Sequence, residues 1–250
     1  MDQVVSGQDG ELSGKPAKKA RKQRSFWVEL PFLVALALAL AFLIKTFLAQ
    51  AFVIPSGSME NTLQVGDRVL VNKLGHWTGS EITRGQVVVF QDPGGWVGGG
   101  SEESSNPVTR VFQRGLMLVG LMPSADQRFL IKRVIALPGD KVKCCDAKGR
   151  LTINGVPLEE TAYLYPGNVP SEVQFERVVQ PGRIWVMGDH RAVSFDSSKH
   201  LNEPFGGSIP ADLVVGRAFT VVWHEGTPSW KPLSVPATFE QPALAGGTGS

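Results

Sequence analysis

An uncharged apolar segment near the start of the chain constrains what the rest can fold into. No residue from 30 to 44 is charged, and between 26 and 52 the only charged residues are Glu29 and Lys45. About 20 mainly apolar helical residues cross the hydrocarbon core of a bilayer. The segment therefore predicts a single transmembrane helix over residues 26–50, with the ammonium group of Lys45 reaching outward to water.

The residues before this segment are basic and polar. Six Lys or Arg side chains lie between residues 15 and 24. Such a stretch cannot build a core, so residues 1–25 are predicted to form a disordered tail. Because basic residues stay on the cytoplasmic side, the tail is expected in the cytoplasm and the rest of the chain outside. The net charge of +2 gives no argument for a nucleic-acid partner.

A removable signal peptide is the alternative interpretation of the same segment. Ala49-Gln50-Ala51 has the A-x-A form of a cleavage site. However, Lys45 separates this site from the apolar residues, and the apolar stretch is longer than the usual h-region of about 7–15 residues. Both features favour a retained anchor. Cleavage after Ala51 would instead release a secreted β-rich binding protein, which N-terminal sequencing of the mature chain would reveal.

The remainder of the chain is predicted to be mainly β. Short runs rich in β-branched residues, bounded by Gly, Pro and Asn turns, predict strands at 68–72, 86–90, 129–137, 150–154, 183–187 and 214–223. Their spacing is typical of a sandwich or barrel-like body over residues 51–225. The Gly- and Ser-rich stretch in 92–128 is predicted to be a mobile insertion. Residues 226–250, which contain four prolines, are predicted to be an irregular tail.

Two adjacent cysteines, Cys144 and Cys145, leave two interpretations open. Neighbouring Cα atoms lie closer together than the usual spacing in a disulfide, so a vicinal disulfide would be strained. Two free thiols near a turn are the alternative. A structural zinc site needs two further ligands, and none is suitably spaced. No metal or cofactor is therefore predicted.

The candidate nucleophile lies directly after the apolar segment. Residues 52–63 place Ser56 and Ser58 on a loop bent by proline and glycine. A serine hydroxyl needs a base, and a buried lysine whose pKa is lowered by desolvation can serve. Lys132 lies in an apolar predicted strand and meets that demand. Taken alone, however, Lys132-Arg133 is also typical of an edge strand whose long side chains reach water.

A Ser-His-Asp triad is a second chemical interpretation. Asp189 and His190 are adjacent, and triads are recognised by geometry rather than by chain order. No serine lies in a Gly-x-Ser-x-Gly elbow, which disfavours this interpretation.

Three segments in a fixed order are more specific than any one of them. They are 55–59 (Pro-Ser-Gly-Ser-Met), 131–140 (Ile-Lys-Arg-Val-Ile-Ala-Leu-Pro-Gly-Asp) and 187–191 (Met-Gly-Asp-His-Arg), the last followed by Ser194 and Asp196. From about residue 30 to 223 the chain resembles the bacterial type I signal peptidases. These are membrane-anchored Ser/Lys endopeptidases that remove signal peptides from exported preproteins at small-x-small sites.

The resemblance implies a fold and partners. The expected fold is a signal-peptidase-like, all-β catalytic body with one N-terminal transmembrane helix and a small inserted β subdomain. The expected partners are the signal peptides of exported preproteins, the lipid bilayer and the secretion machinery, without nucleic acid. The expected location is the cell membrane, with the catalytic domain outside the cytoplasm.

The resemblance also implies roles for particular residues. Ser58 would be the nucleophile and Lys132 the general base. The hydroxyl of Ser56 would join the Ser58 backbone N–H as the oxyanion hole, and Ser194 would hydrogen-bond Lys132. The residues implied to support this loop are Asp189, Arg191 and Asp196. The residues implied to line shallow pockets for small substrate side chains are Phe52, Ile54, Pro55 and Ile131.

The chain departs from the family pattern at one place. The family usually has polar residues between the Arg and the Ser of the third segment, whereas this chain has Ala192 and Val193. The departure puts the hydrogen-bond support of the loop in doubt and leaves a specialised or inactive paralogue as an alternative. A self-cleaving Ser/Lys protease of the LexA-repressor type would need a DNA-binding domain, which the sequence does not show. Self-cleavage at residues 49–51 is a further alternative.

Overall fold

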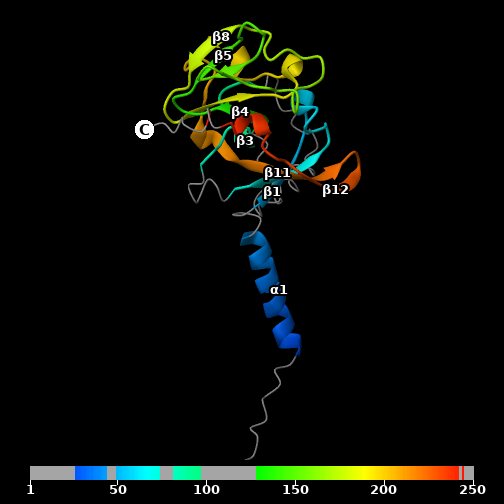
Figure 1. Ribbon diagram of the computed structural model, residues 1–250. Helices are drawn as coiled ribbons and strands as arrows, with labels where there is room; N and C mark the ends of the chain where they lie inside the picture. Colours follow the sequence, from blue (N-terminus) through cyan, green and yellow to red (C-terminus); the bar gives the residue numbers. More distant parts are fainter. Residues whose placement is uncertain (1–25, 44–48, 74–80, 97–127, 242–243, 245–250) are drawn as a thin grey trace, which may run out of the picture. The chain divides into compact units, whose positions relative to one another are not determined.

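The computed structural model describes residues 26–43, 49–73, 81–96, 128–241 and 244 (Figure 1). The chain divides into two compact units, Met1–Ala41 and Phe42–Ser250. Helix α1 (Phe26–Leu43) has Glu29 in its first turn and contains Pro31. In the described part of the chain, no helix has the length and apolar character needed to cross a membrane. The predicted tail 1–25, the stretch 44–48 of the predicted span and most of the predicted insertion, 97–127, lie outside the described residues.

A large antiparallel sheet forms the body of the second unit. Its order is β1-β2-β11-β3-β4-β9-β10. Strand β12 pairs with β11, and Figure 1 shows the two side by side. The strands are β1 (Ala49–Val53), β2 (Arg68–Asn72), β3 (Val87–Gln91), β4 (Phe129–Ala136), β9 (Arg183–Met187), β10 (Ile209–Pro210), β11 (Val214–His224) and β12 (Thr227–Pro232). The mainly β prediction is confirmed, and the predicted strands differ from the observed ones by a few residues at their ends.

Each face of this sheet carries a buried apolar cluster. One face packs the cluster Ile54, Met59, Leu63, Val69, Val71, Val87, Val89, Ile131, Ala218 and Val221. The other packs Val88, Phe90, Trp96, Val134, Ile184, Val186, Ile209 and Val214. Strand β4 lies between β3 and β9, with neighbours on both sides. The edge-strand interpretation of Lys132 and Arg133 is therefore wrong, because both side chains are 2% exposed inside a central strand.

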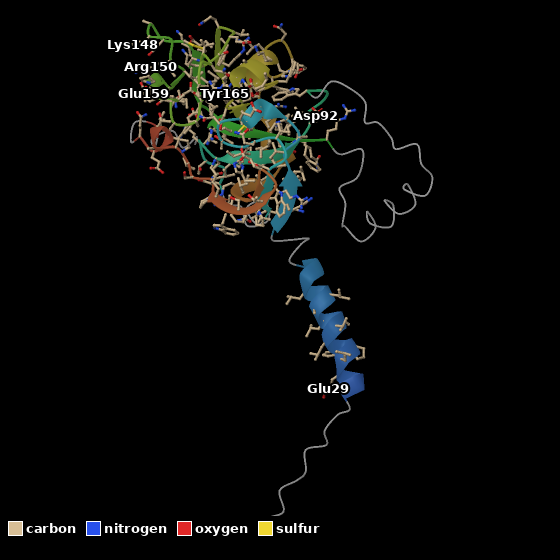
Figure 2. All side chains as sticks on the ribbon, turned by 90° about the vertical axis from the view of Figure 1, so that its right-hand side faces the viewer. Glu29, Asp92, Lys148, Arg150, Glu159 and Tyr165 are labelled. Atoms are coloured by element: carbon tan, nitrogen blue, oxygen red, sulfur yellow. A yellow bond between two sulfur atoms is a disulfide. The ribbon has the colours of Figure 1, made fainter. Side chains whose placement is uncertain are left out.

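A smaller four-stranded sheet matches the predicted inserted subdomain. Its order is β7-β6-β5-β8, and its strands are β5 (Lys141–Cys144), β6 (Thr152–Ile153), β7 (Val156–Pro157) and β8 (Phe175–Val178). The β6–β7 turn has positive φ at Asn154 and Gly155, as tight hairpins require. Near this sheet Arg150 pairs with Glu159 (Figure 2). Cys144 and Cys145 form a disulfide.

One apolar cluster joins the two sheets. It contains Ile135 and Trp185 from the large sheet and Val142 and Phe175 from the small one. Phe239, from the C-terminal segment, belongs to the same cluster. The large sheet and the small sheet therefore share one core.

The predicted irregular tail is ordered where the structure describes it. Strand β12 pairs with β11, and a short 3-10 helix, η6 (Ala237–Phe239), follows it. The carbonyl of Leu244 accepts a hydrogen bond from Arg84 at 2.8 Å. The prediction of an irregular tail is wrong here because an edge strand tolerates prolines, whose missing N–H needs no partner on the open side.

Candidate active site

The predicted nucleophile lies on a short 3-10 turn, η2 (Gly57–Met59), that follows β1. Ser58 is buried, and the side chains of Met59 and Leu63 hold the turn in the apolar cluster on one face of the large sheet. The residue before the turn, Ser56, is extended (φ −135°, ψ 154°). Its hydroxyl lies 3.4 Å from the hydroxyl of Ser58, so the two predicted serines are brought together.

The predicted base reaches the predicted nucleophile. Nζ of Lys132 and Oγ of Ser58 are hydrogen-bonded at 2.5 Å, although 74 residues separate them in the chain. Burial lowers the pKa of Lys132 from 10.5 to about 8, and the carboxylates of Asp196 and Asp189 act in the opposite direction. A lysine with such a pKa has an accessible neutral form, which can accept a proton from a hydroxyl group.

Ser194 lies beside the nucleophile turn but does not make the expected contact. It is buried, and its hydroxyl has no hydrogen-bond partner among the residues that the structure describes. A Cβ built on Gly188 would lie 2.3 Å from Oγ of Ser194 and 2.5 Å from the carbonyl oxygen of Ser58. The absence of a side chain at Gly188 thus lets these three residues pack together. The implied hydrogen bond from Ser194 to Lys132 is not formed in this structure.

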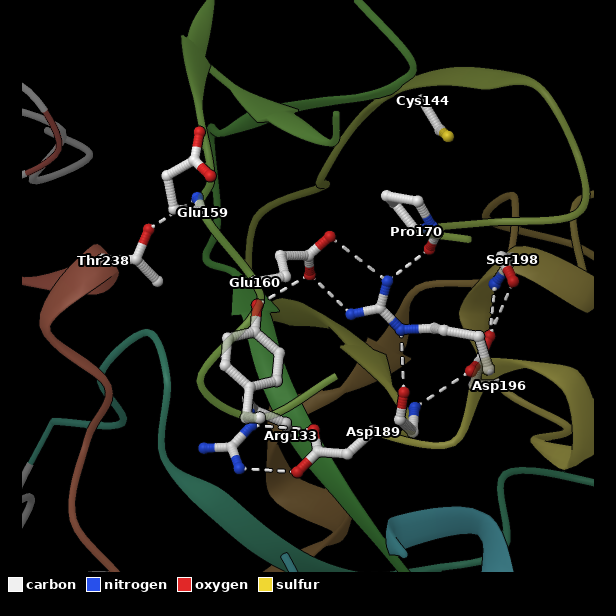
Figure 3. A network of polar contacts seen from close by, with 12 residues as sticks. Arg133, Cys144, Glu159, Glu160, Pro170, Asp189, Asp196, Ser198 and Thr238 are labelled. Carbon is white, nitrogen blue, oxygen red and sulfur yellow. Dashed lines mark hydrogen bonds and ion pairs between the residues drawn. The ribbon is translucent and has the colours of Figure 1, made fainter. Parts of the chain in front are cut away.

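Asp196 holds the loop that carries these residues. One carboxylate oxygen accepts a hydrogen bond from the N–H of Gly188 at 2.9 Å (Figure 3). The other accepts from the backbone N–H of Ser198 at 3.1 Å and from its hydroxyl at 2.7 Å. The buried carboxylate therefore closes the loop on itself and points a negative charge toward Lys132.

Asp189 ties the nucleophile turn to β4. Arg133 donates two hydrogen bonds to its carboxylate, at 2.8 and 2.6 Å (Figure 3). Thr62, just after the nucleophile turn, donates its hydroxyl to the same carboxylate at 2.5 Å. Arg133 also donates to the carbonyl of Gly85 at 2.7 Å. The bidentate pair and these additional hydrogen bonds fix the buried side chains of Arg133 and Asp189 in one orientation.

Arg191 connects the catalytic loop to a segment that sequence reasoning missed. Its guanidinium donates to Glu160 at 2.6 Å and to the carbonyl of Gly188 at 2.8 Å, and it also contacts the carbonyl of Pro170 (Figure 3). Tyr163 donates its hydroxyl to Glu160 at 2.7 Å. No local pattern marks Glu160 as a site residue, because Arg191 lies 31 residues away from it in the sequence.

The two positions that depart from the family pattern, Ala192 and Val193, lie between anchored residues of the loop. The N–H of Ala192 donates to the side chain of Asn168 at 3.1 Å. Val193 is 52% exposed. Arg191 and Asp196 supply the anchoring on either side.

The four residues expected to line substrate pockets differ in their surroundings. Ile54 and Ile131 are buried in the cluster around Met59. Phe52 packs against that cluster, edge-to-face with Phe129 at 5.3 Å. Pro55 is exposed.

The Ser-His-Asp interpretation is wrong. The ring of His190 hydrogen-bonds Glu60 rather than a serine. The carboxylate of Asp189 is taken by Arg133 and Thr62.

A mainly β body that presents a buried serine hydroxyl to a buried lysine is the arrangement of a serine peptidase. A family model described as signal peptidase, peptidase S26, matches residues 27–223, and the chain belongs to this family. It is 39% identical over 238 residues to signal peptidase I of Mycobacterium tuberculosis (strain H37Rv), covering 86% of this chain and 80% of the relative. It is 38% identical to a probable signal peptidase I of Mycobacterium leprae, covering 81% and 78%.

A crystal structure of a signal peptidase I from Enterococcus faecalis V583 was also matched. The alignment covers 55% of this chain and 97% of that chain, with a TM-score of 0.34 and 20% sequence identity. With the family established, the chain is a serine endopeptidase that removes signal peptides.

Proposed function

We propose that Ser58 and Lys132 are the catalytic dyad of this peptidase. The observation that carries the proposal is the 2.5 Å hydrogen bond between Nζ of Lys132 and Oγ of Ser58, two side chains that are both buried. Neutral Lys132 takes the hydroxyl proton while Oγ attacks the carbonyl carbon of the scissile bond.

The remaining steps return the proton and release both products. The ammonium of Lys132 gives its proton to the leaving amine as the C–N bond breaks. Neutral Lys132 then removes a proton from water, whose oxygen attacks the acyl ester. Oγ of Ser58 leaves and recovers the proton from Nζ. The carboxylates of Asp196 and Asp189 support the protonated intermediate, because they favour the ammonium form.

The oxyanion that develops on the carbonyl needs donors. We assign the hydroxyl of Ser56 and the backbone N–H of Ser58, supported by the 3.4 Å separation of the two hydroxyl groups. Such donors are typically worth a few kcal/mol in the transition state. Phe52, Ile54, Pro55 and Ile131 are proposed to contact small side chains of the substrate, and Asp189, Arg191, Ser194 and Asp196 to support the catalytic loop.

Substitution of each dyad residue tests the assignment. Ser58→Ala and Lys132→Met are each expected to lower kcat by about 10³-fold or more on a signal-peptide reporter. At pH 7 a buried ammonium costs on the order of 3 kcal/mol, because the pKa falls from 10.5 to about 8 on folding. Lys132→Met should therefore unfold at higher urea concentration than the wild type.

The stability measurement separates loss of chemistry from loss of fold. The pKa of Lys132 is lower in the folded than in the unfolded protein. The loss of unfolding free energy that its burial causes is therefore complete below pH 8 and vanishes as pH rises past about 10.5. The increase in unfolding free energy that Lys132→Met produces should vanish over the same pH range. Wild-type kcat in either variant would exclude the dyad. A Lys132→Met protein less stable than the wild type at pH 7 would contradict the burial cost.

Residues 26–50 are proposed to anchor the enzyme in the cell membrane, with the catalytic domain outside the cytoplasm and near the bilayer and the secretion machinery. Two observations support this: basic residues precede the apolar segment, and the large apolar side chains described along α1 are exposed. The protein should resist carbonate extraction of membranes, and protease added to spheroplasts should digest the catalytic domain. Release by carbonate, or full protection from protease, would refute the topology.

A further inference from the structure

The mechanism above leaves one polar pair beside the nucleophile without a role. Nδ1 of His190 lies 3.0 Å from Oε2 of Glu60, two residues after Ser58. A carboxylate only accepts hydrogen bonds, so Nδ1 carries the proton and donates it. The ring of Tyr165 stacks on the imidazole at 3.8 Å between centroids, with an angle of 8° between the planes (Figure 2 labels Tyr165).

Glu60 lies against the backbone that presents the nucleophile. A Cβ built on Gly57 would lie 2.8 Å from Oε1 of Glu60 and 2.9 Å from Cδ. The backbone N–H of Glu60 also donates to the carbonyl of Gly57 at 3.0 Å. The carboxylate therefore covers the peptide between Ser56 and Ser58, the residues proposed to supply the oxyanion donors.

His190 holds this turn at two points. Its ring binds Glu60, and its backbone N–H donates to the carbonyl of Ser58 at 3.1 Å. The backbone of Tyr165 is fixed in turn, since its N–H donates to the carbonyl of Asp189 at 2.9 Å. Asn61, which has a φ of +82°, donates its side-chain amide to the carbonyl of Leu164 at 3.0 Å. Two segments distant in sequence, 164–165 and 189–190, thus close around the turn.

We propose that Glu60 and His190, backed by Tyr165, are positioning residues that hold the Gly57–Ser58 backbone in register with the substrate carbonyl. The inference rests on the proposed dyad and oxyanion donors and extends them to a pair that touches neither the substrate nor the reacting atoms. A purely stabilising role is a poor explanation. The side chains of His190 and Glu60 are 15% and 27% exposed, and ion pairs that reach solvent contribute little to stability.

Kinetics of four variants on a signal-peptide reporter test the proposal. Glu60→Ala breaks the bond, His190→Phe breaks it while keeping an aromatic ring on Tyr165, and Glu60→Gln keeps a hydrogen-bonding group in place. Glu60→Ala and His190→Phe are each expected to lower kcat about 10-fold with KM unchanged, because small displacements at the reacting atoms are costly. Glu60→Gln should retain most of kcat. The double variant Glu60→Ala/His190→Phe should be no slower than the slower single variant.

A second His–Glu–aromatic cluster provides the matched control. His200 hydrogen-bonds Glu203 at 2.6 Å and stacks on Trp96 at 4.3 Å. Glu203→Ala removes the same chemistry elsewhere in the fold, and kcat should equal that of the wild type. If Glu60 and His190 position the nucleophile turn, their loss should lower the plateau of the kcat–pH profile. The rising limb of the profile, set by the pKa of Lys132 at about 8, should stay at the same pH.

Several outcomes would overturn the inference. The first is a wild-type kcat in both Glu60→Ala and His190→Phe, and the second is a change in KM alone in these variants. The third is a double variant whose loss of kcat equals the combined losses of the single variants. The fourth is a kcat of Glu60→Gln as low as that of Glu60→Ala. An equal loss in Glu203→Ala would also overturn it. Failure of the dyad itself is recognised separately, because Ser58→Ala would then remain active whatever the Glu60 variants do.

Discussion

Lys132 illustrates at the residue scale how a fold makes a base out of a cation. The sequence offered an apolar strand that contained a lysine, and two interpretations of it were open. The structure buries the ammonium and sets two carboxylates, Asp196 and Asp189, to resist the resulting fall in its pKa. The value of about 8 reflects these opposed effects. Neither carboxylate is near Lys132 in sequence, so the balance could not be read from the strand.

This balance predicts a pH dependence. If neutral Lys132 is the base, kcat/KM rises with pH through about 8. Asp196→Asn removes a negative charge that favours the ammonium, so the pKa of Lys132 falls and the limb moves to lower pH. Profiles of kcat/KM, each normalised to its own plateau, should show this shift. The control is Glu176→Gln, which alters an exposed carboxylate on β8 and should leave the rising limb of the profile at the same pH. A limb that moves to higher pH in Asp196→Asn would contradict the assignment of Lys132 as the base.

At the element scale, the site depends on how β4 meets the loop after β9. Adjacent residues of β4, Lys132 and Arg133, reach different partners, Ser58 and Asp189. The loop can approach the nucleophile turn only because Gly188 has no side chain. Sequence patterns predicted β4 and β9 as strands and marked the loop by its motif. They did not reveal the close approach, which is a contact between segments about 130 residues apart.

Gly188→Ala tests this approach. The added methyl group would lie 2.5 Å from the carbonyl oxygen of Ser58 and 2.3 Å from Oγ of Ser194, so the backbone has to move. A displacement of that size is expected to lower kcat by about 10²-fold. Gly149→Ala is the control. The added methyl group would meet no atom within 4 Å, but the φ of +77° at this residue disfavours a side chain. It should cost about 1 kcal/mol of stability and leave kcat unchanged. Equal kcat values for both variants would show that the approach is unimportant.

At the scale of the whole molecule, one core supports both the site and the subdomain. The cluster that joins the sheets contains Phe239, whose ring lies 5.7 Å from that of Tyr163. Tyr163 in turn bonds Glu160, the partner of Arg191. The C-terminal segment therefore belongs to the catalytic domain, contrary to the irregular tail that its prolines predicted.

Phe239→Ala measures what this segment contributes. The side chain is 7% exposed, and removing it should lower the free energy of unfolding by about 3 kcal/mol in urea titrations. Trp230→Ala is matched to it, since this aromatic side chain lies in the same segment but is 69% exposed, and it should change stability by less than about 0.5 kcal/mol. Equal losses in the two variants would contradict a structural role for the segment.

The sequence by itself determined six of the strands that the structure describes, the family resemblance and the identity of the paired residues, Ser58 and Lys132. These follow from local patterns: apolar runs that end at turns, and motifs in a fixed order. Tertiary structure alone decided that β4 is a central strand, that Glu160 anchors Arg191 and that His190 binds Glu60 rather than a serine. The physical reason is that burial and hydrogen-bond pairing depend on contacts between distant segments, and local propensity carries no information about them.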